Sequence, residues 1–264
     1  MIFDTVGEKG NPRVVMLNGS FTSGSALIPL AERIADSCYV VLPTYDGHHK
    51  DGGEFTTRQG QAEKIMTYLA AEGISDIALL QGLSMGAEVA LDLAVMLAES
   101  PDFTVRRCLF DGGPFFSFGP VMRAIMRKKF TGLIHGCQGK TPEEAWEHIN
   151  ANKMVNWMVK GDLEPYRSMI WDMAGDAPHM TDQSIANESD ACYTFDFPEA
   201  SPDVQATWTF SWSSNEPAHS SAKRIRKHYP HANYRDAGPL GHGGFALREP
   251  EAYADLLRAL ALEG

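Results

Sequence analysis

Short apolar runs alternate with stretches of helical spacing in the first part of the chain. The apolar runs, each typical of a buried β-strand, cover residues 13–19, 38–43, 76–81 and 106–113. Between them, apolar residues recur with helical spacing at 26–36, 56–74 and 86–99. This alternation predicts an α/β fold: a mostly parallel central sheet with right-handed crossovers and helices on both faces.

The strand pattern is interrupted between about residues 115 and 200. No β-type run appears there; the stretch is rich in Met and Trp and contains a helical segment in which Thr141 and Glu144 match a capping box. The pattern then resumes as strand, helix, strand and closing helix at 204–212, 220–230, 232–238 and 250–263. We therefore predict one α/β domain, built from 1–114 and 201–264, with 115–200 as a helical insertion after the fourth parallel strand.

The composition limits the classes of molecule that we expect the protein to bind. The 264 residues carry a formal net charge of −11, with 44% hydrophobic and 22% charged residues. Because an acidic chain repels phosphates, we expect neither nucleic-acid nor membrane binding. The chain opens without a basic, apolar leader, and no apolar run approaches the roughly 18 residues of a transmembrane helix. Its four cysteines show no C-x-x-C spacing, so we expect reduced thiols in a cytoplasmic protein.

The sequence QGLSMGAEVA joins the third strand to a helix and carries a serine between two glycines. A serine hydroxyl acts as a nucleophile when it projects from the backbone and has a base within hydrogen-bond reach. A sharp strand-to-helix turn brings the positions two residues away so close that only small residues fit, and Gly82 and Gly86 meet this demand. We predict Ser84 as the nucleophile; the alternative is a glycine-rich turn with an idle serine.

His242 stands in GPLGHGGFA, directly after a predicted strand, where flanking glycines let the backbone bring the imidazole inward. We predict it as the general base, against the alternative of a loop histidine in a flexible turn. A carboxylate must orient the imidazole. Glu216, just past the first strand after the insertion, is the predicted acid, and Asp111, at the end of the preceding strand, is the alternative. His48 and His49 lie in a polar turn without metal-ligand spacing, so we expect them to be solvated or structural.

Acyl transfer also needs N–H donors for a tetrahedral oxyanion. The amide after the nucleophile, on Met85, is the first predicted donor. The second should come from the loop LNGSFTSGS, where Gly19 permits a tight turn. The Ser20 amide is our prediction, with Phe21 second. The side chain of Ser20 or Asn18 is a further option, and a simple Gly-Ser loop is the alternative.

These elements resemble the α/β-hydrolase fold superfamily over nearly all of the chain outside 115–200. VVMLNGS is similar to the oxyanion-loop strand, LLQGLSMGAEVALDLA to the nucleophile elbow, FSWSSNEPA to the acid loop and PLGHGG to the histidine loop. The chain order Ser, acid, His is the family's own. The chain departs from the family at Asn18, where His is usual, and in a Glu where Asp is commoner. The resemblance implies that 115–200 is a cap over the active site.

The residues and the resemblance together predict a serine hydrolase that cleaves a carboxylic ester of modest size through an acyl-enzyme, with no metal or organic cofactor. The substrate is a small molecule that enters between cap and core. Phe21 and Phe115 are candidate substrate-binding residues in an adaptable apolar pocket, although such side chains also serve simply to pack cap helices onto a core. An aminopeptidase or amidase, an acyltransferase and a ligand-binding member of the same fold are the alternatives.

Overall fold

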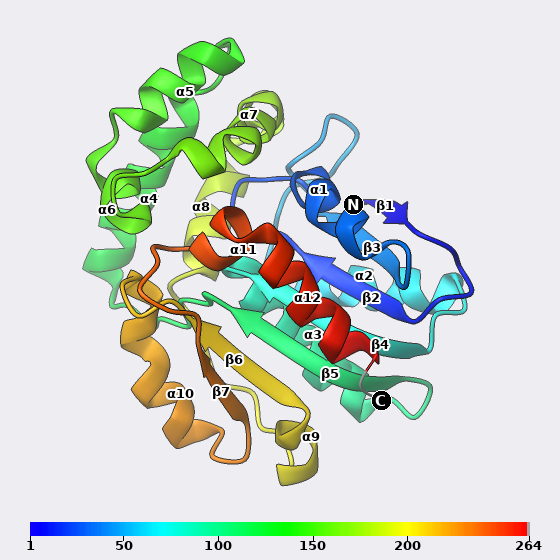
Figure 1. Ribbon diagram of the computed structural model, residues 1–264. Coiled ribbons are helices and arrows are strands. Elements are labelled where there is room, and N and C mark those ends of the chain that lie inside the picture. Colours follow the sequence, from blue (N-terminus) through cyan, green and yellow to red (C-terminus); the bar gives the residue numbers. More distant parts are fainter. Residues whose placement is uncertain (263–264) are drawn as a thin grey trace.

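The computed structural model describes residues 1–262 as a seven-stranded sheet flanked by helices (Figure 1). The strand order is β1-β3-β2-β4-β5-β6-β7. β1 pairs antiparallel with β3, and every other neighbouring pair is parallel. The predicted fold class is therefore confirmed. The strands are β1 (Ile2–Val6), β2 (Arg13–Leu17), β3 (Tyr39–Thr44), β4 (Asp76–Leu83), β5 (Thr104–Asp111), β6 (Trp208–Trp212) and β7 (Asn233–Asp236).

Helices cover both faces of this sheet (Figure 1). None of the helices in residues 1–262 is long and apolar enough to cross a lipid bilayer. The helices are α1 (Ile28–Ala31), α2 (Arg58–Ala71), α3 (Met85–Glu99), α4 (Pro120–His135), α5 (Pro142–Asn150), α6 (Lys153–Val159), α7 (Arg167–Asp176), α8 (Asp182–Ala191), α9 (Pro202–Ala206), α10 (Ala222–His228), α11 (Gly244–Arg248) and α12 (Pro250–Leu262).

The structure differs from the sequence prediction at three elements, of which one was missed and two have other bounds. The antiparallel strand β1 was not expected, because its residues are only partly buried and show no continuous apolar run. The helix expected at 26–36 is broken into short pieces, and its α-helical part starts at Ile28 so that Pro29 falls in the first turn, where a proline is tolerated. The strand expected from 204 begins at Trp208, because Ser201 caps a short helix, α9, in front of it.

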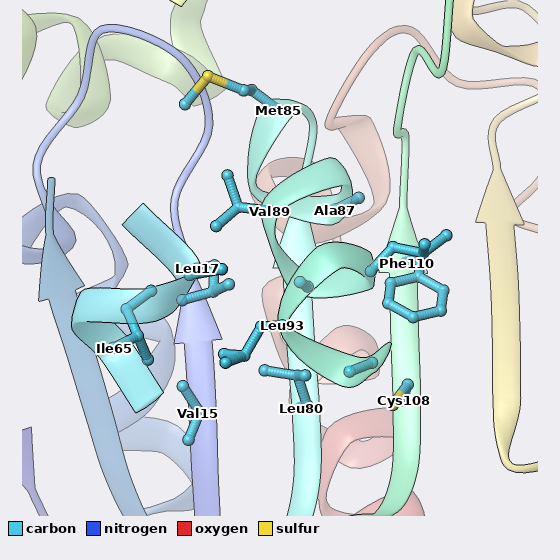
Figure 2. Packing of buried hydrophobic residues seen from close by; sticks show 14 of the residues in the cluster. Val15, Leu17, Ile65, Leu80, Met85, Ala87, Val89, Leu93, Cys108 and Phe110 are labelled. Atoms are coloured by element: carbon cyan, nitrogen blue, oxygen red, sulfur yellow. The ribbon is translucent and has the colours of Figure 1, made fainter. Parts of the chain in front are cut away.

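The two faces of β2 show how the sheet is held between its helices. Val15 and Leu17 belong to the cluster that contains α2 and α3, whereas the alternate residues Val14 and Met16 belong to the cluster that contains α1 and α12. Figure 2 shows the first of these clusters, with Leu93 of α3 lying against the sheet. α3 is therefore fixed along its length, and its first turn gives rigid support to the residue that precedes the helix.

Five helices between β5 and β6, α4 to α8, form a separate group that we call the inserted helices. They lie beyond the ends toward which the parallel strands point (Figure 1). They have a hydrophobic cluster of their own, which includes Phe130, Ile149 and Ile170 and which Phe21 joins from the loop after β2. The segments that lead into and out of the group are joined by a bridge between Ser117 and Thr194.

Candidate active site

Ser84 stands where β4 ends and α3 begins. Its φ is 58° and its ψ −123°, which is a strained conformation for a residue with a side chain. The flanking glycines make this turn possible. A Cβ on Gly82 would lie 2.2 Å from the Gly86 carbonyl oxygen, and a Cβ on Gly86 would lie 2.4 Å from the Asn18 carbonyl oxygen. Backbone contacts therefore require both glycines, and the turn holds Ser84 clear of the sheet.

The structure brings Ser84, His242 and Glu216 into one hydrogen-bonded chain. His242 Nε2 lies 2.8 Å from Ser84 Oγ, and His242 Nδ1 lies 2.6 Å from Glu216 Oε2. The other oxygen of Glu216 accepts from the Ser213 N–H at 2.7 Å, which fixes the carboxylate. Because Nδ1 faces a carboxylate, the neutral imidazole carries its proton there and leaves Nε2 free to accept the hydroxyl proton.

The electrostatic setting of His242 suits a base that works near neutral pH. Burial lowers the pKa of His242, but the hydrogen bond and charge of Glu216, with a smaller contribution from Asp111, raise it above its ordinary value. The imidazole therefore takes up a proton readily when the Glu216 carboxylate is beside it.

Asp111, the alternative acid, lies close to this chain without bonding to His242, whose Nδ1 faces Glu216. Asp111 ends β5 and is only 4% exposed, and its carbonyl oxygen accepts from the Ser84 N–H at 2.9 Å. Burial, and secondly the charge of Glu216, raise the pKa of Asp111 to about 7. A carboxyl group that is partly protonated at neutral pH is a poor partner for an imidazolium, so the geometry and the charge both favour Glu216.

The same fold occurs in solved structures of low sequence identity. An α/β-hydrolase family protein from Desulfitobacterium hafniense is 16% identical, with a TM-score of 0.73 over 97% of this chain and 98% of its own. An enol-lactonase from Burkholderia xenovorans is 13% identical, with a TM-score of 0.72 over 98% of this chain and 95% of its own. A carboxylesterase from Bacillus subtilis is 16% identical, with a TM-score of 0.65 over 99% and 87%. The chain has the α/β-hydrolase fold. No protein-family model and no curated protein matches its sequence.

The predicted second oxyanion donor belongs to the loop that follows β2, and this loop reaches Ser84. A Cβ on Gly19 would lie 3.3 Å from Ser84 Cβ. Within residues 1–262, the N–H groups of Ser20 and Met85 donate to no protein acceptor, so both are free for a ligand. The Asn18 side chain is not a further donor, because its Nδ2 is bonded to two carbonyl groups of its own loop.

The two predicted substrate-binding phenylalanines have different positions in this α/β-hydrolase fold. Phe21 lies in the wall of the cavity above Ser84, and its N–H donates to Glu188 Oε1 at 2.6 Å, so it is not a spare oxyanion donor. Phe115 lies in the core, 0% exposed, with its ring 4.9 Å from that of Phe195. Its φ of 44° turns the ring back over the bare backbone of Gly113, so Phe115 is not a substrate-binding candidate.

A cavity of about 1000 Å³ opens above Ser84, and Ser84 and His242 lie in its wall. Glu216, which is bonded to His242, is the only acidic residue in that wall within the described chain, and Lys129 and Lys153 are the only lysines. The wall is otherwise mostly apolar, and the inserted helices supply much of it, including Met122, Met126, Phe130, Met154, Trp157, Met158, Met169 and Met173. The site therefore suits an apolar ligand of considerable size.

Residues of α6 and of the segment between α6 and α7 hold the backbone of the histidine loop. The His242 N–H donates to the Met158 carbonyl at 2.9 Å, and the His242 carbonyl accepts from the Tyr166 hydroxyl at 2.6 Å. Arg248 of α11 adds an ion pair to Asp162 at 2.9 Å. Sequence reasoning missed these contacts because a lone tyrosine or a main-chain carbonyl in a helical stretch carries no signal of its partner.

His48 is fully buried. Of the two expectations for this residue, solvated or structural, the first is therefore wrong. The Nε2 of His48 lies 2.8 Å from Glu188 Oε2, and His49 beside it is partly buried. The four cysteines are free and buried. Within residues 1–262, no group of three or more His, Cys, Asp or Glu side chains is placed to hold a metal ion.

Proposed function

We propose that the protein is a serine hydrolase that cleaves a carboxylic ester through an acyl-enzyme. The observation that carries this proposal is the hydrogen-bonded chain from Ser84 through His242 to Glu216 at the wall of an apolar cavity. A pure binding protein has no need of a serine paired with an oriented base. Esterases among the structures of the same fold support the same class of reaction.

The reaction follows from the positions of these groups. Ser84 Oγ attacks the ester carbonyl while His242 Nε2 takes its proton, and the negative charge develops on the carbonyl oxygen. The N–H groups of Ser20 and Met85 stabilise that oxyanion. His242 then protonates the leaving alcohol, and in the second half of the reaction it activates water that releases the acid. Glu216 keeps the imidazole oriented throughout.

The cavity indicates which esters fit. Its volume of about 1000 Å³ and its apolar wall suit an ester with a large apolar group, rather than the modest-sized ester expected from the sequence. We propose that residues 115–200 act as a cap that supplies this wall. An aminopeptidase would need an acidic group to bind the substrate amine, and the only wall carboxylate within the described chain, Glu216, is bonded to His242.

A series of p-nitrophenyl esters tests the proposal. Wild-type protein should hydrolyse them, with kcat/KM rising from the acetate to medium-chain acyl groups as more of the cavity is filled. Ser84→Ala and His242→Ala should lose this activity. Ser220→Ala is the matched control, because Ser220 also lies in the cavity wall but bonds only to the Pro217 carbonyl. Cleavage of aminoacyl amides without turnover of any ester would contradict the proposal.

A further inference from the structure

A second buried cluster of polar groups lies behind the oxyanion loop and takes no part in the chain from Ser84 to Glu216. Glu188 of α8 accepts from the Phe21 N–H at 2.6 Å with one oxygen and lies 2.8 Å from His48 Nε2 with the other. The side chains of Glu188 and His48 are 1% and 0% exposed. The cluster thus joins an inserted helix to the loops that follow β2 and β3.

Burial of a carboxylate is costly unless its oxygens are paired, and here both oxygens have partners. Burial lowers the pKa of His48, but the nearby carboxylate of Glu188 raises it above the ordinary value, with a further contribution from Asp176. The contact with His48 therefore keeps the Glu188 carboxyl group in place against the Phe21 N–H.

The loop needs such an acceptor, because Phe21 is strained. Its φ is 61°, in the left-handed region that a bulky side chain disfavours, and such a conformation persists only when the surroundings hold it. The surroundings hold Phe21 at two points. Glu188 binds its N–H, and its ring lies 5.0 Å from the ring of Phe130 within the cluster of the inserted helices.

This strained residue directly follows the proposed oxyanion donor. The Phe21 N–H belongs to the peptide plane that Ser20 begins, so fixing that plane limits the orientation of the Ser20 backbone. Cys192, at the end of α8, adds a second contact, with its Sγ 3.1 Å from Ser20 Oγ. The Ser20 N–H itself has no protein acceptor within residues 1–262.

We infer that Glu188 is a positioning residue that holds the oxyanion loop in its working shape by binding the Phe21 N–H, with His48 holding Glu188 in turn. This inference rests on the proposed serine hydrolase function. It gives the inserted helices a part in catalysis, since α8 reaches behind the reaction centre to the backbone that carries the Ser20 donor. Glu188 does not touch the substrate.

Glu188→Ala and Glu188→Gln separate positioning from simple structural support. Glu188→Ala should lower kcat on a p-nitrophenyl ester about tenfold to hundredfold with KM nearly unchanged, because a misaimed donor weakens the transition state and not the ground state. Binding of an aryl trifluoromethyl ketone, whose adduct carries the oxyanion, should weaken by a similar factor. Glu188→Gln should keep most of the wild-type kcat and of the wild-type ketone affinity, because its amide oxygen still accepts from the Phe21 N–H.

Asp190→Ala is the control for loss of a carboxylate on α8, because Asp190 pairs with Arg127 at the surface. Circular dichroism and the melting temperature show whether each variant folds. Should Glu188→Ala fail to fold, Glu188→Asp replaces it, since its carboxylate is one methylene further from the Phe21 N–H and should show the same fall in kcat.

The outcomes separate the inference from the function on which it rests. Wild-type protein that neither hydrolyses esters nor binds the ketone would refute the proposed function. An active wild type whose folded Glu188→Ala variant keeps its kcat and its ketone affinity would overturn the positioning role. The positioning role would also be overturned if Glu188→Gln lost as much kcat and ketone affinity as Glu188→Ala, or if Glu188→Ala changed only KM.

Discussion

Replacement of Glu216 by glutamine removes a charge from the candidate active site with little change in shape. The oxygen of the new amide can still accept from the Ser213 N–H, which in the wild type lies 2.7 Å from Glu216 Oε1. The NH2 group of that amide would then face His242 Nδ1, which in the wild type is 2.6 Å from a carboxylate oxygen. Because two donors cannot share that contact, the imidazole turns to the tautomer with its proton on Nε2. It can then no longer accept the proton of Ser84.

Because Glu216→Gln removes general-base catalysis, it should lower kcat/KM at pH 8 by about 100-fold to 10,000-fold. The pH profile should move as well. His242 must be neutral to act as a base, and in the wild type its pKa is raised, so activity should fall as the pH drops through a value above about 6.5. Glu216 is the main group that raises this pKa. The residual activity of Glu216→Gln should therefore persist to lower pH than that of the wild type.

Initial rates on one p-nitrophenyl ester between about pH 5 and 9 measure both effects. Asp111→Asn is the matched control, because Asp111 is buried beside the same chain but is not the partner of His242 Nδ1. Because the pKa of Asp111 is about 7, this group is already partly neutral at neutral pH. Its replacement by the amide should therefore lower the rate less than about tenfold. A larger loss in Asp111→Asn than in Glu216→Gln would refute the assignment of the acid, and an unchanged acid limb in Glu216→Gln would refute the electrostatic reasoning.

Other substitutions test the turn, the histidine loop and the cavity. Gly86→Ala should abolish activity and lower the stability by about 1–3 kcal/mol in chemical denaturation, because the new Cβ would lie 2.4 Å from backbone oxygens; wild-type behaviour would contradict the close approach. Tyr166→Phe removes the 2.6 Å bond to the His242 carbonyl and should cost about 0.5–1.5 kcal/mol in stability, with kcat reduced severalfold; an unchanged kcat and melting temperature would show that this bond is idle. Met173→Trp should slow octanoate hydrolysis more than acetate hydrolysis, and equal effects on both would argue against Met173 lining the acyl site.

The features of the structure that the sequence predicted best are those that local patterns encode. The order of parallel strands and helices follows from hydrophobic periodicity, and the turn at Ser84 follows from two glycines between a buried strand and a buried helix. His242 and Glu216 were predicted by a similar argument, since each stands in a short loop directly after a strand of the same sheet. The carboxyl ends of parallel strands lie at one edge, so such loops converge.

Long-range contacts were beyond this reasoning. Glu188 and His48 are 140 positions apart, and nothing local marks the helix residue as the partner of the loop residue. The prediction that Phe115 lines the pocket rested on residue type alone, whereas its ring lies in the core and its φ is positive, which nothing in the sequence marks. The size of the cavity depends on how the inserted helices pack over the sheet, which their amphipathic patterns do not specify.

The reactivity of Ser84 is the most direct test of the account. A fluorophosphonate forms a stable bond only with a serine that is activated by a neighbouring base. Peptide mapping by mass spectrometry after treatment of the wild-type protein should find one label per chain, at Ser84, with none in Ser84→Ala and a strongly reduced amount in His242→Ala. Absence of label from folded wild-type protein, or a label at another serine that survives in Ser84→Ala, would contradict the account.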